Sequence, residues 1–326
     1  MTLTFHPALS LSHIEKAAER IRGHAVRTPV IEHATLNEIA QGRIYLKAEC
    51  LQRTGSFKFR GAFNKVAQLS SAQHRAGVVA CSSGNHAQGL ALAARLFDTQ
   101  ATIVMPRDAP SIKISNTQGY GAEVVLYDRH NESREEIAAA ISKRTGALFI
   151  PPYDDFDIMA GQGTCGLEII EDHPKIEFDA VLTAASGGGL TAGVATAFRT
   201  LSADTNVYTV EPAGHDDHAK SFQTGLRSHN DNPSPSICDA LLAPTPGEHT
   251  FAVNQNLVTG GLAVSDEEVK QAIRFAFSHL KLVLEPGGAA TLAAILHRSE
   301  LQGLNIAAVL SGGNIDPNFY AALLNA

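Results

Sequence analysis

One lysine stands in the segment of this sequence that has the most chemical content. Lys58 lies within GSFKFRGA at residues 55–62, between two phenylalanines and just after a Gly-Ser turn. Lysine normally keeps its ammonium group in water, so aromatic neighbours on both sides indicate a partly dehydrated amine. Dehydration lowers the pKa of a lysine and leaves a nucleophile suited to condensation with a carbonyl group. The alternative is a lysine at a helix start whose aliphatic stem passes two core phenylalanines.

A glycine-rich turn lies between an apolar run and a helix-like pattern. The segment SGGGLT at residues 186–191 comes directly after the apolar run at 180–184. Three consecutive glycines let successive backbone N–H groups converge, and the dipole of the following helix adds positive potential. The pattern therefore favours a phosphate-binding loop over a simple flexible turn. No lysine follows in the position typical of nucleoside triphosphate sites, so we expect no nucleoside triphosphate there.

A second glycine-rich segment, GQGTCG at residues 161–166, formally matches the dinucleotide fingerprint G-x-G-x-x-G. The residues before it, 154–160, do not form the apolar strand that the fingerprint requires. Close packing of helices explains these glycines, and a dinucleotide-dependent oxidoreductase is the weaker alternative.

Acidic residues follow another apolar run, in the segment EPAGHDD at residues 211–217. Two separated carboxylates with backbone carbonyls between them suit a hard cation such as Mg²⁺ or Ca²⁺. His215 and His218 could instead recruit a softer metal. A solvated acidic loop is the alternative without any ion.

Composition excludes several classes of protein. The 326 residues are 44% hydrophobic and 18% charged, which is typical of a globular chain with a large core. A formal charge of −7 without a basic run argues against a nucleic-acid or anionic-membrane surface. No apolar run reaches membrane-spanning length, and residues 1–15 lack the pattern of a signal peptide. We expect a cytoplasmic protein, because the four cysteines are widely spaced, as reduced thiols are: Cys50, Cys81, Cys165 and Cys238.

Apolar, β-branched runs alternate with helix-like patterns along the chain. This alternation predicts an α/β fold with a mostly parallel sheet and helices on both faces, and ligand sites in the loops beyond the strands. A stretch without periodicity at 213–256 is typical of a long loop that covers or builds a site. The expected strands lie at 77–81, 101–105, 123–127, 180–183, 207–210 and 306–310, and the expected helices at 88–97, 133–143, 190–200 and 266–280.

Together these segments closely resemble the fold type II pyridoxal-phosphate enzymes, in the serine/threonine dehydratase and serine racemase branch. The motifs G-S-F-K-x-R-G-A, S-S-G-N-H, S-G-G-G, E-P and S-G-G-N occur in the expected order between about residues 27 and 314. The resemblance implies a tryptophan synthase β-like α/β fold, with two three-layer α/β/α domains and the cofactor between them. It implies a large cofactor-binding domain of residues 1–54 and 150–326, a small mobile domain of residues 55–149, and a homodimer.

The resemblance also implies a role for each matching residue around pyridoxal 5′-phosphate. Lys58 would hold the cofactor as an imine and then act as the base at the substrate Cα. Phe57 would pack against the pyridine ring, Asn85 would bond to its 3′ oxygen, and Ser311 would face the ring nitrogen. The phosphate would lie against Gly187, Gly188, Gly189 and Leu190.

Substrate and metal roles follow from the same resemblance. Arg134 would reach a second acidic group of the substrate, and Ser83 matches a second acid/base that racemases of the branch place opposite the lysine. At a helix start, Ser83 could equally be a simple hydrogen-bonding residue. The α-carboxylate of an amino-acid substrate would bind at a helix N-terminus, on Ser82, Ser83, Asn85 and His86. A divalent cation (Mg²⁺, Mn²⁺ or Ca²⁺) would bind Glu211, the carbonyl of His215 and Asp217.

Two positions depart from the pattern of the branch. The branch often carries Ala-Asp-Gly near its active site, and the corresponding segment here is CDA at residues 238–240. A nearby position that is commonly serine is Ala243 in this chain. Both changes alter the surroundings of the substrate side chain, so they affect the identity of the substrate more than the chemistry.

The activity implied is that of an ammonia-lyase (dehydratase) that eliminates water and ammonia from L-threonine or L-serine and gives a 2-oxo acid. A hydroxyl rather than a carboxylate at the ring nitrogen, as implied for Ser311, favours elimination over transamination. One alternative is a 3-hydroxyaspartate ammonia-lyase giving oxaloacetate, in which Arg134 neutralises the side-chain carboxylate. A serine racemase that uses Ser83 is another. A further alternative is a non-catalytic carrier of pyridoxal phosphate, and the retention of Lys58 disfavours it.

Overall fold

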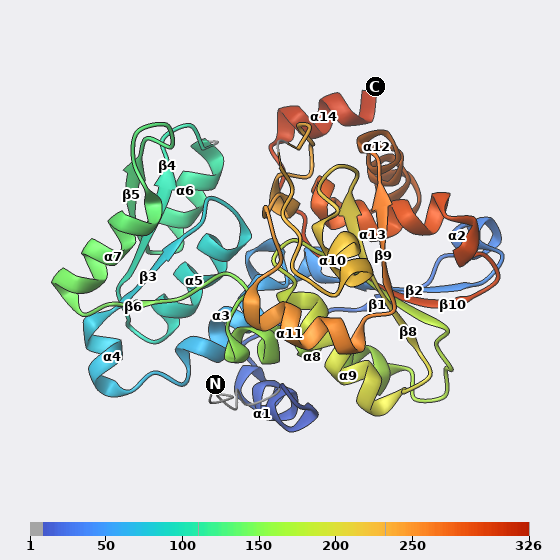
Figure 1. Ribbon diagram of the computed structural model, residues 1–326, viewed down its shortest axis with the longest axis horizontal. Helices are drawn as coiled ribbons and strands as arrows, with labels where there is room; N and C mark the ends of the chain where they lie inside the picture. Colours follow the sequence, from blue (N-terminus) through green and yellow to red (C-terminus); the bar gives the residue numbers. More distant parts are fainter. Residues whose placement is uncertain (1–8, 110, 232, 326) are drawn as a thin grey trace.

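The computed structural model describes residues 9–109, 111–231 and 233–325, whose strands form two β-sheets (Figure 1). In these residues all neighbouring strands pair in parallel except β1 and β2, which are antiparallel. The first sheet has the order β1 (Val30–Ile31), β2 (Arg43–Ala48), β10 (Asn305–Leu310), β7 (Ala180–Ala184), β8 (Asn206–Pro212) and β9 (Gly260–Val264). The second has the order β5 (Glu123–Tyr127), β4 (Ala101–Pro106), β3 (Val78–Cys81) and β6 (Leu148–Phe149).

Helices cover both faces of each sheet, as Figure 1 shows. On the first sheet, α2, α12 and α13 share one core, and α8 and α9 share the core of the opposite face. On the second sheet, α3 and α5 cover one face and α7 the other. The helices are α1 (Leu11–Ile21), α2 (Ala34–Ala40), α3 (Lys58–Val66), α4 (Ser71–Ala76), α5 (Asn85–Leu96), α6 (Ser111–Gly119), α7 (Arg134–Thr145), α8 (Phe156–Asp172), α9 (Gly189–Leu201), α10 (Asp217–Thr224), α11 (Glu248–Leu257), α12 (Asp266–Phe275), α13 (Pro286–His297) and α14 (Pro317–Asn325).

The alternation of side chains along each strand produces these layers. Residues 306, 308 and 310 of β10 point into the core under α13, whereas residues 307 and 309 point into the core against α8 and α9. A strand buried on both faces must be apolar throughout, which is why β10 reads as a continuous apolar run. The predicted α/β fold with two three-layer α/β/α arrangements is confirmed.

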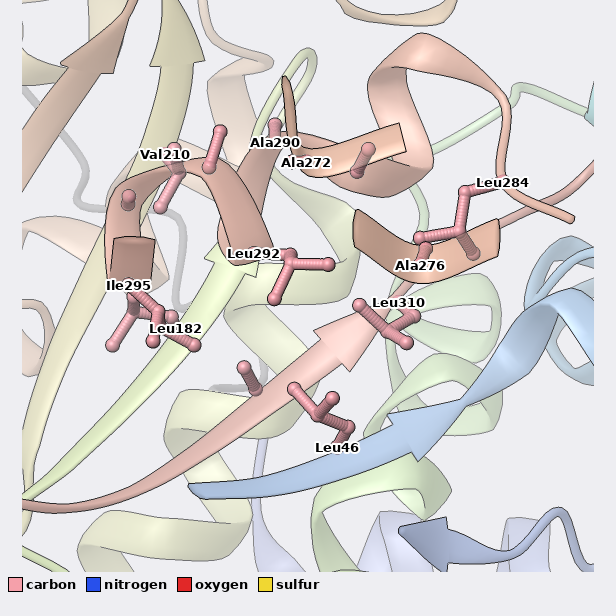
Figure 2. Packing of buried hydrophobic residues seen from close by; sticks show 14 of the residues in the cluster. Leu46, Leu182, Val210, Ala272, Ala276, Leu284, Ala290, Leu292, Ile295 and Leu310 are labelled. Atoms are coloured by element: carbon pink, nitrogen blue, oxygen red, sulfur yellow. The ribbon is translucent and has the colours of Figure 1, made fainter. Parts of the chain in front are cut away.

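The larger core gives the first sheet its rigidity. Figure 2 shows Leu46, Leu182 and Leu310, from three strands, packed beneath Leu292 and Ile295 of α13. All five side chains are buried. Truncation of such a leucine to alanine typically costs about 2–5 kcal/mol. The loops at the ends of these strands are therefore attached to a well-packed sheet.

The predicted strands correspond to β3, β4, β5, β7, β8 and β10, and the predicted helices to α5, α7, α9 and α12. The helix expected at 266–280 ends at Phe275 and continues as a π-helical turn, Ala276–Leu280. Sequence analysis missed β2, because the charge of Lys47 interrupts its apolar pattern. The expectation of a long loop at 213–256 was wrong in part, since the segment contains α10 and α11. No helix of the described ranges is long and apolar enough to cross a membrane.

The glycines of the false dinucleotide fingerprint lie inside α8. A Cβ atom at Gly161 would stand 2.6 Å from the Cα of Gly61 in α3, and one at Gly163 would stand 2.9 Å from the carbonyl oxygen of Gly193 in α9. These glycines let α8 pack directly against the backbones of two other helices. The explanation by close helix packing is confirmed. Because residues 1–8 lie outside the described part, the prediction that residues 1–15 hold no signal peptide falls partly outside it.

A buried ionic network joins α3 to β2 and α8. Arg60 Nη2 lies 2.7 Å from Glu49 Oε1, and Arg60 Nη1 lies 2.7 Å from Glu168 Oε1. Lys47 Nζ completes the network at 2.6 Å from Glu168 Oε2. Burial alone would raise the pKa of Glu49, but the Arg60 guanidinium holds it below its ordinary value. The network fixes the first turn of α3, because Arg60 lies two residues after Lys58, where the helix begins.

Candidate active site

A pocket of about 610 Å³ opens where the carboxyl ends of strands from both sheets meet. The loops after β3, β7 and β10 all contribute to it, as expected for ligand sites of parallel sheets. Most of the predicted site residues line this pocket: Phe57, Lys58, Ser82, Ser83, Asn85, His86, Arg134, Gly187, Gly188, Gly189, Leu190 and Ser311. Segments up to about 250 residues apart in sequence are thereby brought together.

Lys58 begins α3 and directs its amine into the pocket. Its Nζ donates a hydrogen bond to the carbonyl oxygen of Pro152 at 2.7 Å and lies 5.1 Å from the centroid of the Phe57 ring. Burial lowers the pKa of Lys58 from 10.5 to about 8, so the predicted direction is confirmed. The second aromatic was assigned wrongly, because Phe59 points into the core and its ring contacts Phe63. Successive residues of a helix point in different directions, so both phenylalanines cannot face the amine.

The cofactor-free enzyme should capture pyridoxal phosphate faster as pH rises, with an inflection near pH 8. Only a neutral amine attacks an aldehyde, and a lysine of pKa about 8 is roughly one-tenth neutral at pH 7 and nine-tenths neutral at pH 9. An ordinary lysine would be less than about 0.1% neutral at pH 7. Borohydride trapping at each pH, followed by quantification of the Lys58 peptide, gives the profile. An inflection above about pH 10 would contradict a dehydrated amine.

The loop after β3 presents the N-terminus of α5 to the pocket. The Ser82 hydroxyl accepts a hydrogen bond from the Gly84 N–H at 3.3 Å, and Asn85 and His86 form the first turn of α5. The first N–H groups of a helix have no partner within it, and the helix dipole favours an anion beside them. Ser83 lines the same side of the pocket. The arrangement suits a carboxylate.

The His86 side chain stays neutral beside Lys58. Burial, and to a lesser extent the charge of Lys58, lower its pKa to about 3. Its Nε2 donates to the carbonyl oxygen of Ile150 at 3.1 Å, since a carbonyl can only accept. His86 therefore contributes no charge of its own to an anion at the start of α5.

Asn85 is held in place by two residues to which the sequence motifs assigned no role. Its Nδ2 donates to Glu285 Oε1 at 2.5 Å, and its Oδ1 accepts from Asn314 Nδ2 at 2.7 Å. Burial raises the pKa of Glu285 to about 7. Glu285 lies directly before a proline that begins α13, but no spacing in the sequence connects it with a residue 200 positions away.

Close contacts leave little room for side chains in the glycine loop after β7. Gly188 has φ +89°, and a Cβ there would stand 2.6 Å from the His218 ring. A Cβ at Gly187 would stand 2.3 Å from the ring of Tyr153, and one at Gly189 2.8 Å from Gln162 Oε1. Glycine is therefore favoured at Gly187 and Gly188, whereas a Cβ at Gly189 would require Gln162 to move. The loop leads into α9, as predicted, so the positive end of the α9 dipole lies at the pocket.

Ser311 follows the central strand β10 and is buried beside the pocket. Its carbonyl oxygen accepts the N–H of Phe57 at 3.2 Å, which ties the end of β10 to the residue before Lys58. Its hydroxyl lies 3.5 Å from the carbonyl oxygen of Gly287. Lysine, serine hydroxyl, glycine loop and helix N-terminus together fit pyridoxal phosphate.

Three basic side chains besides Lys58 line the pocket. Arg134 begins α7 and is exposed, and its Nε pairs with Glu135 Oε1 at 2.7 Å. Lys113 pairs with Asp239, and Arg227 Nε donates to the carbonyl oxygen of Pro246 at 2.9 Å. Sequence analysis named only Arg134, since the other two lie in segments without a motif.

The predicted cation ligands lie outside the pocket, at the end of β8 and the start of α10. Glu211 Oε1 and Oε2 accept the N–H groups of His218 at 2.8 Å and Ala219 at 2.9 Å. Burial and the nearby charge of Asp217 raise the pKa of Glu211 well above its ordinary value. The His215 ring donates to the carbonyl oxygen of Ser234 at 2.8 Å. Across the described ranges, no three His, Cys, Asp or Glu side chains cluster as metal ligands.

Comparison with known proteins agrees with this geometry. The model of the family described as "Pyridoxal-phosphate dependent enzyme" matches residues 21–312. An L-threo-3-hydroxyaspartate ammonia-lyase of Pseudomonas sp is 45% identical, covering 97% of this chain and 98% of its own length. An L-threonine ammonia-lyase of Thermotoga maritima is 40% identical, covering 97% and 78%. The structure of maize serine racemase superposes with a TM-score of 0.92 at 34% identity, covering 98% and 97%. The chain therefore belongs to the pyridoxal-phosphate dependent enzymes, as a carbon–nitrogen lyase of the fold type II serine/threonine dehydratase family.

Proposed function

We propose that this enzyme is an ammonia-lyase whose preferred substrate is L-threo-3-hydroxyaspartate, which it converts to oxaloacetate and ammonia. The observation that carries the proposal is the presence of two anion-binding elements in one pocket. The N-terminus of α5 suits the α-carboxylate, and the Arg134 guanidinium suits a second carboxylate on the side chain. The name of the Pseudomonas relative supports the same substrate.

Each residue of the pocket has its own role in the proposed elimination. Bound pyridoxal phosphate supplies the sink for the electron pair that remains when the substrate Cα loses its proton. The Lys58 amine takes that proton, because its lowered pKa leaves a useful fraction neutral near physiological pH. The start of α5 and Arg134 hold the two carboxylates and so orient the Cα–H bond toward Lys58. Ser311 offers a neutral hydroxyl to the ring nitrogen, which favours loss of the β-hydroxyl.

The second candidate is L-threonine or L-serine, as the wider branch suggests. Arg134 is already paired with Glu135. If that pair persists with substrate bound, Glu135 neutralises the charge of Arg134, and a substrate with an uncharged side chain is preferred. The Thermotoga relative supports this alternative.

Replacement of Arg134 by alanine should separate the two candidates. Loss of a hydrogen-bonded charge pair with the substrate should lower kcat/KM for L-threo-3-hydroxyaspartate by roughly 10- to 100-fold. The same change should alter kcat/KM for L-threonine by less than about threefold. Steady-state rates of ammonia release on both substrates provide the measurement.

The matched control is Arg129→Ala. Arg129 is an exposed arginine paired with Asp108, outside the pocket, and its loss should leave both rates unchanged. A wild-type enzyme that favours L-threonine over every 3-hydroxyaspartate stereoisomer would overturn the proposed substrate.

Racemisation is proposed as a side activity that depends on Ser83. Its hydroxyl shares the pocket with Lys58, and two bases on opposite faces of Cα allow a proton to be removed from one and returned to the other. Chiral analysis of serine recovered from an L-serine reaction should show D-serine with the wild type and none with Ser83→Ala. Equal D-serine from both enzymes would exclude this role.

A divalent cation is proposed at Glu211, the His215 carbonyl and Asp217. Both carboxylates are buried, and Asp217 Oδ2 has no hydrogen-bond partner in the described residues. A cation would bind that oxygen and neutralise the negative charge of both carboxylates. Millimolar Mg²⁺ or Ca²⁺ should raise the Tm of the wild type and not that of Asp217→Asn, with the exposed Asp231→Asn as control. Equal shifts in Tm for wild type and Asp217→Asn would remove the site.

Domain movement and dimerisation are proposed on separate grounds. Residues 55–149 would move as a small domain against residues 1–54 and 150–326. The Lys113–Asp239 pair links α6 to the far wall of the pocket, and opening of the pocket would separate these two side chains. A smaller radius of gyration with a substrate analogue would support closure, and an unchanged one would oppose it.

A homodimer would cover Phe277 and Val283, which are about half exposed. Sedimentation equilibrium should give twice the chain mass, and a monomer would oppose the proposal.

A further inference from the structure

Three consecutive carbonyl groups of the glycine loop are held by side chains from outside the pocket. His218 Nε2 donates to the Ser186 oxygen at 2.7 Å, since a carbonyl can only accept. Thr250 Oγ1 donates to the Gly187 oxygen at 2.5 Å. Asn254 Nδ2 donates to the Gly188 oxygen at 3.1 Å. Every peptide of the loop is therefore fixed from one side.

The three donors are fully buried and come from two helices in the segment that looked like a long loop. His218 lies in α10, and Thr250 and Asn254 lie four residues apart on one face of α11. None of the three lines the pocket. They cannot touch the ring or the substrate, so any effect on cofactor binding passes through the loop.

Their direction determines where the N–H groups of the loop point. In a trans peptide the N–H of one residue points opposite to the C=O of the residue before it, and the described residues contain no cis peptide bond. The carbonyls of residues 186–188 point toward α10 and α11. The N–H groups of Gly187, Gly188 and Gly189 therefore point in the opposite direction, toward the pocket. Two of these carbonyls also accept a backbone N–H group, from Gly247 to the Gly187 oxygen at 3.1 Å and from Ala192 to the Gly188 oxygen at 2.9 Å. The side-chain donors therefore add to these backbone contacts in restricting a run of three glycines, the most flexible residue.

Both helices are themselves anchored at their first turns. Glu211 accepts the N–H of His218 at 2.8 Å, and Asp154 accepts the N–H groups of Glu248 and Thr250, each at 3.0 Å. A carboxylate that accepts these N–H groups satisfies donors that a helix start leaves free. The first turns that carry His218 and Thr250 are therefore held by carboxylates from outside the glycine loop.

We propose that His218, Thr250 and Asn254 are positioning residues that preorganise the glycine loop for the phosphate monoester of the cofactor. The loop reaches its binding geometry before the cofactor arrives, so binding does not bear the entropy of ordering three glycines. The proposal concerns cofactor affinity and is independent of which amino acid is the substrate.

The test compares pyridoxal 5′-phosphate with pyridoxal, which lacks the phosphate. Cofactor-free wild type and Thr250→Val are titrated with each aldehyde, and binding is followed by absorbance. Loss of one hydrogen bond to the loop should weaken pyridoxal phosphate by about three- to tenfold. The affinity for pyridoxal should change by less than about twofold, because pyridoxal does not use the loop. General damage to the pocket would weaken both aldehydes alike.

Two further variants complete the experiment. Thr250→Ser keeps the hydroxyl and should restore the affinity for pyridoxal phosphate. Thr196→Val removes a buried threonine hydroxyl of α9, which donates to the Ala192 oxygen of the same helix at 2.8 Å, and should leave both affinities unchanged. The proposal is overturned if Thr250→Val weakens both aldehydes equally or neither. It is also overturned if Thr250→Ser behaves like Thr250→Val. Since no substrate is present, a wrong assignment of the substrate leaves this result unaffected.

Discussion

Replacement of Lys58 by alanine is expected to lower kcat for ammonia release by about 10³-fold or more, because we propose that this one group is both the covalent anchor of the cofactor and the base at Cα. The pocket offers no substitute among the described residues. Its other lysine, Lys113, pairs with Asp239, whereas the Lys58 amine faces the neutral carbonyl of Pro152. The measurement is a coupled assay of 2-oxo acid formation with purified wild type and variant.

The control for this loss lies on the same helix. Lys65 of α3 pairs with Asp155 at 2.7 Å and Asp157 at 2.8 Å, outside the pocket, so Lys65→Ala should change kcat by less than about threefold. Borohydride treatment of the wild type, followed by peptide mapping, should place the cofactor on Lys58. Labelling of another residue would refute the assignment, as would substantial turnover by Lys58→Ala.

Replacement of Arg60 by methionine is expected to cost about 3–5 kcal/mol of the free energy of unfolding. The guanidinium contacts Glu49 and Glu168, and all three side chains are buried. Its removal leaves two buried carboxylates with Lys47 as their remaining cation. Arg60→Lys should be intermediate, because an ammonium group cannot form the same fork of hydrogen bonds. Denaturant unfolding of the cofactor-free proteins, followed by circular dichroism, measures the difference.

An exposed ion pair provides the comparison. Arg43 pairs with Glu32 at 3.0 Å, and their side chains are 55% and 33% exposed. Because water screens such a pair, Arg43→Met should cost less than about 1 kcal/mol. Equal losses for Arg43→Met and Arg60→Met would show that burial does not govern the strength of the network.

The chemistry of this protein could be predicted where neighbours in sequence are also neighbours in space. The strand, glycine turn and helix at 180–201 form one local unit, so this strand–turn–helix arrangement could be predicted from the residue order. The lowered pKa of Lys58 was predicted in direction from its local surroundings. The role of Phe59 was misjudged, because the direction of its side chain depends on which core α3 packs against.

Apolar periodicity and local turn chemistry by themselves determined the class of fold and the positions of six strands along the chain, and they predicted the residues that would bind an aldehyde and a phosphate. Only the tertiary structure decided what surrounds them. Glu285 beside Asn85, and Thr250 beside Gly187, are contacts over 200 and 63 positions. Such contacts depend on how two sheets and their helices pack, and packing depends on the shape of many side chains at once, which no spacing of a few residues encodes.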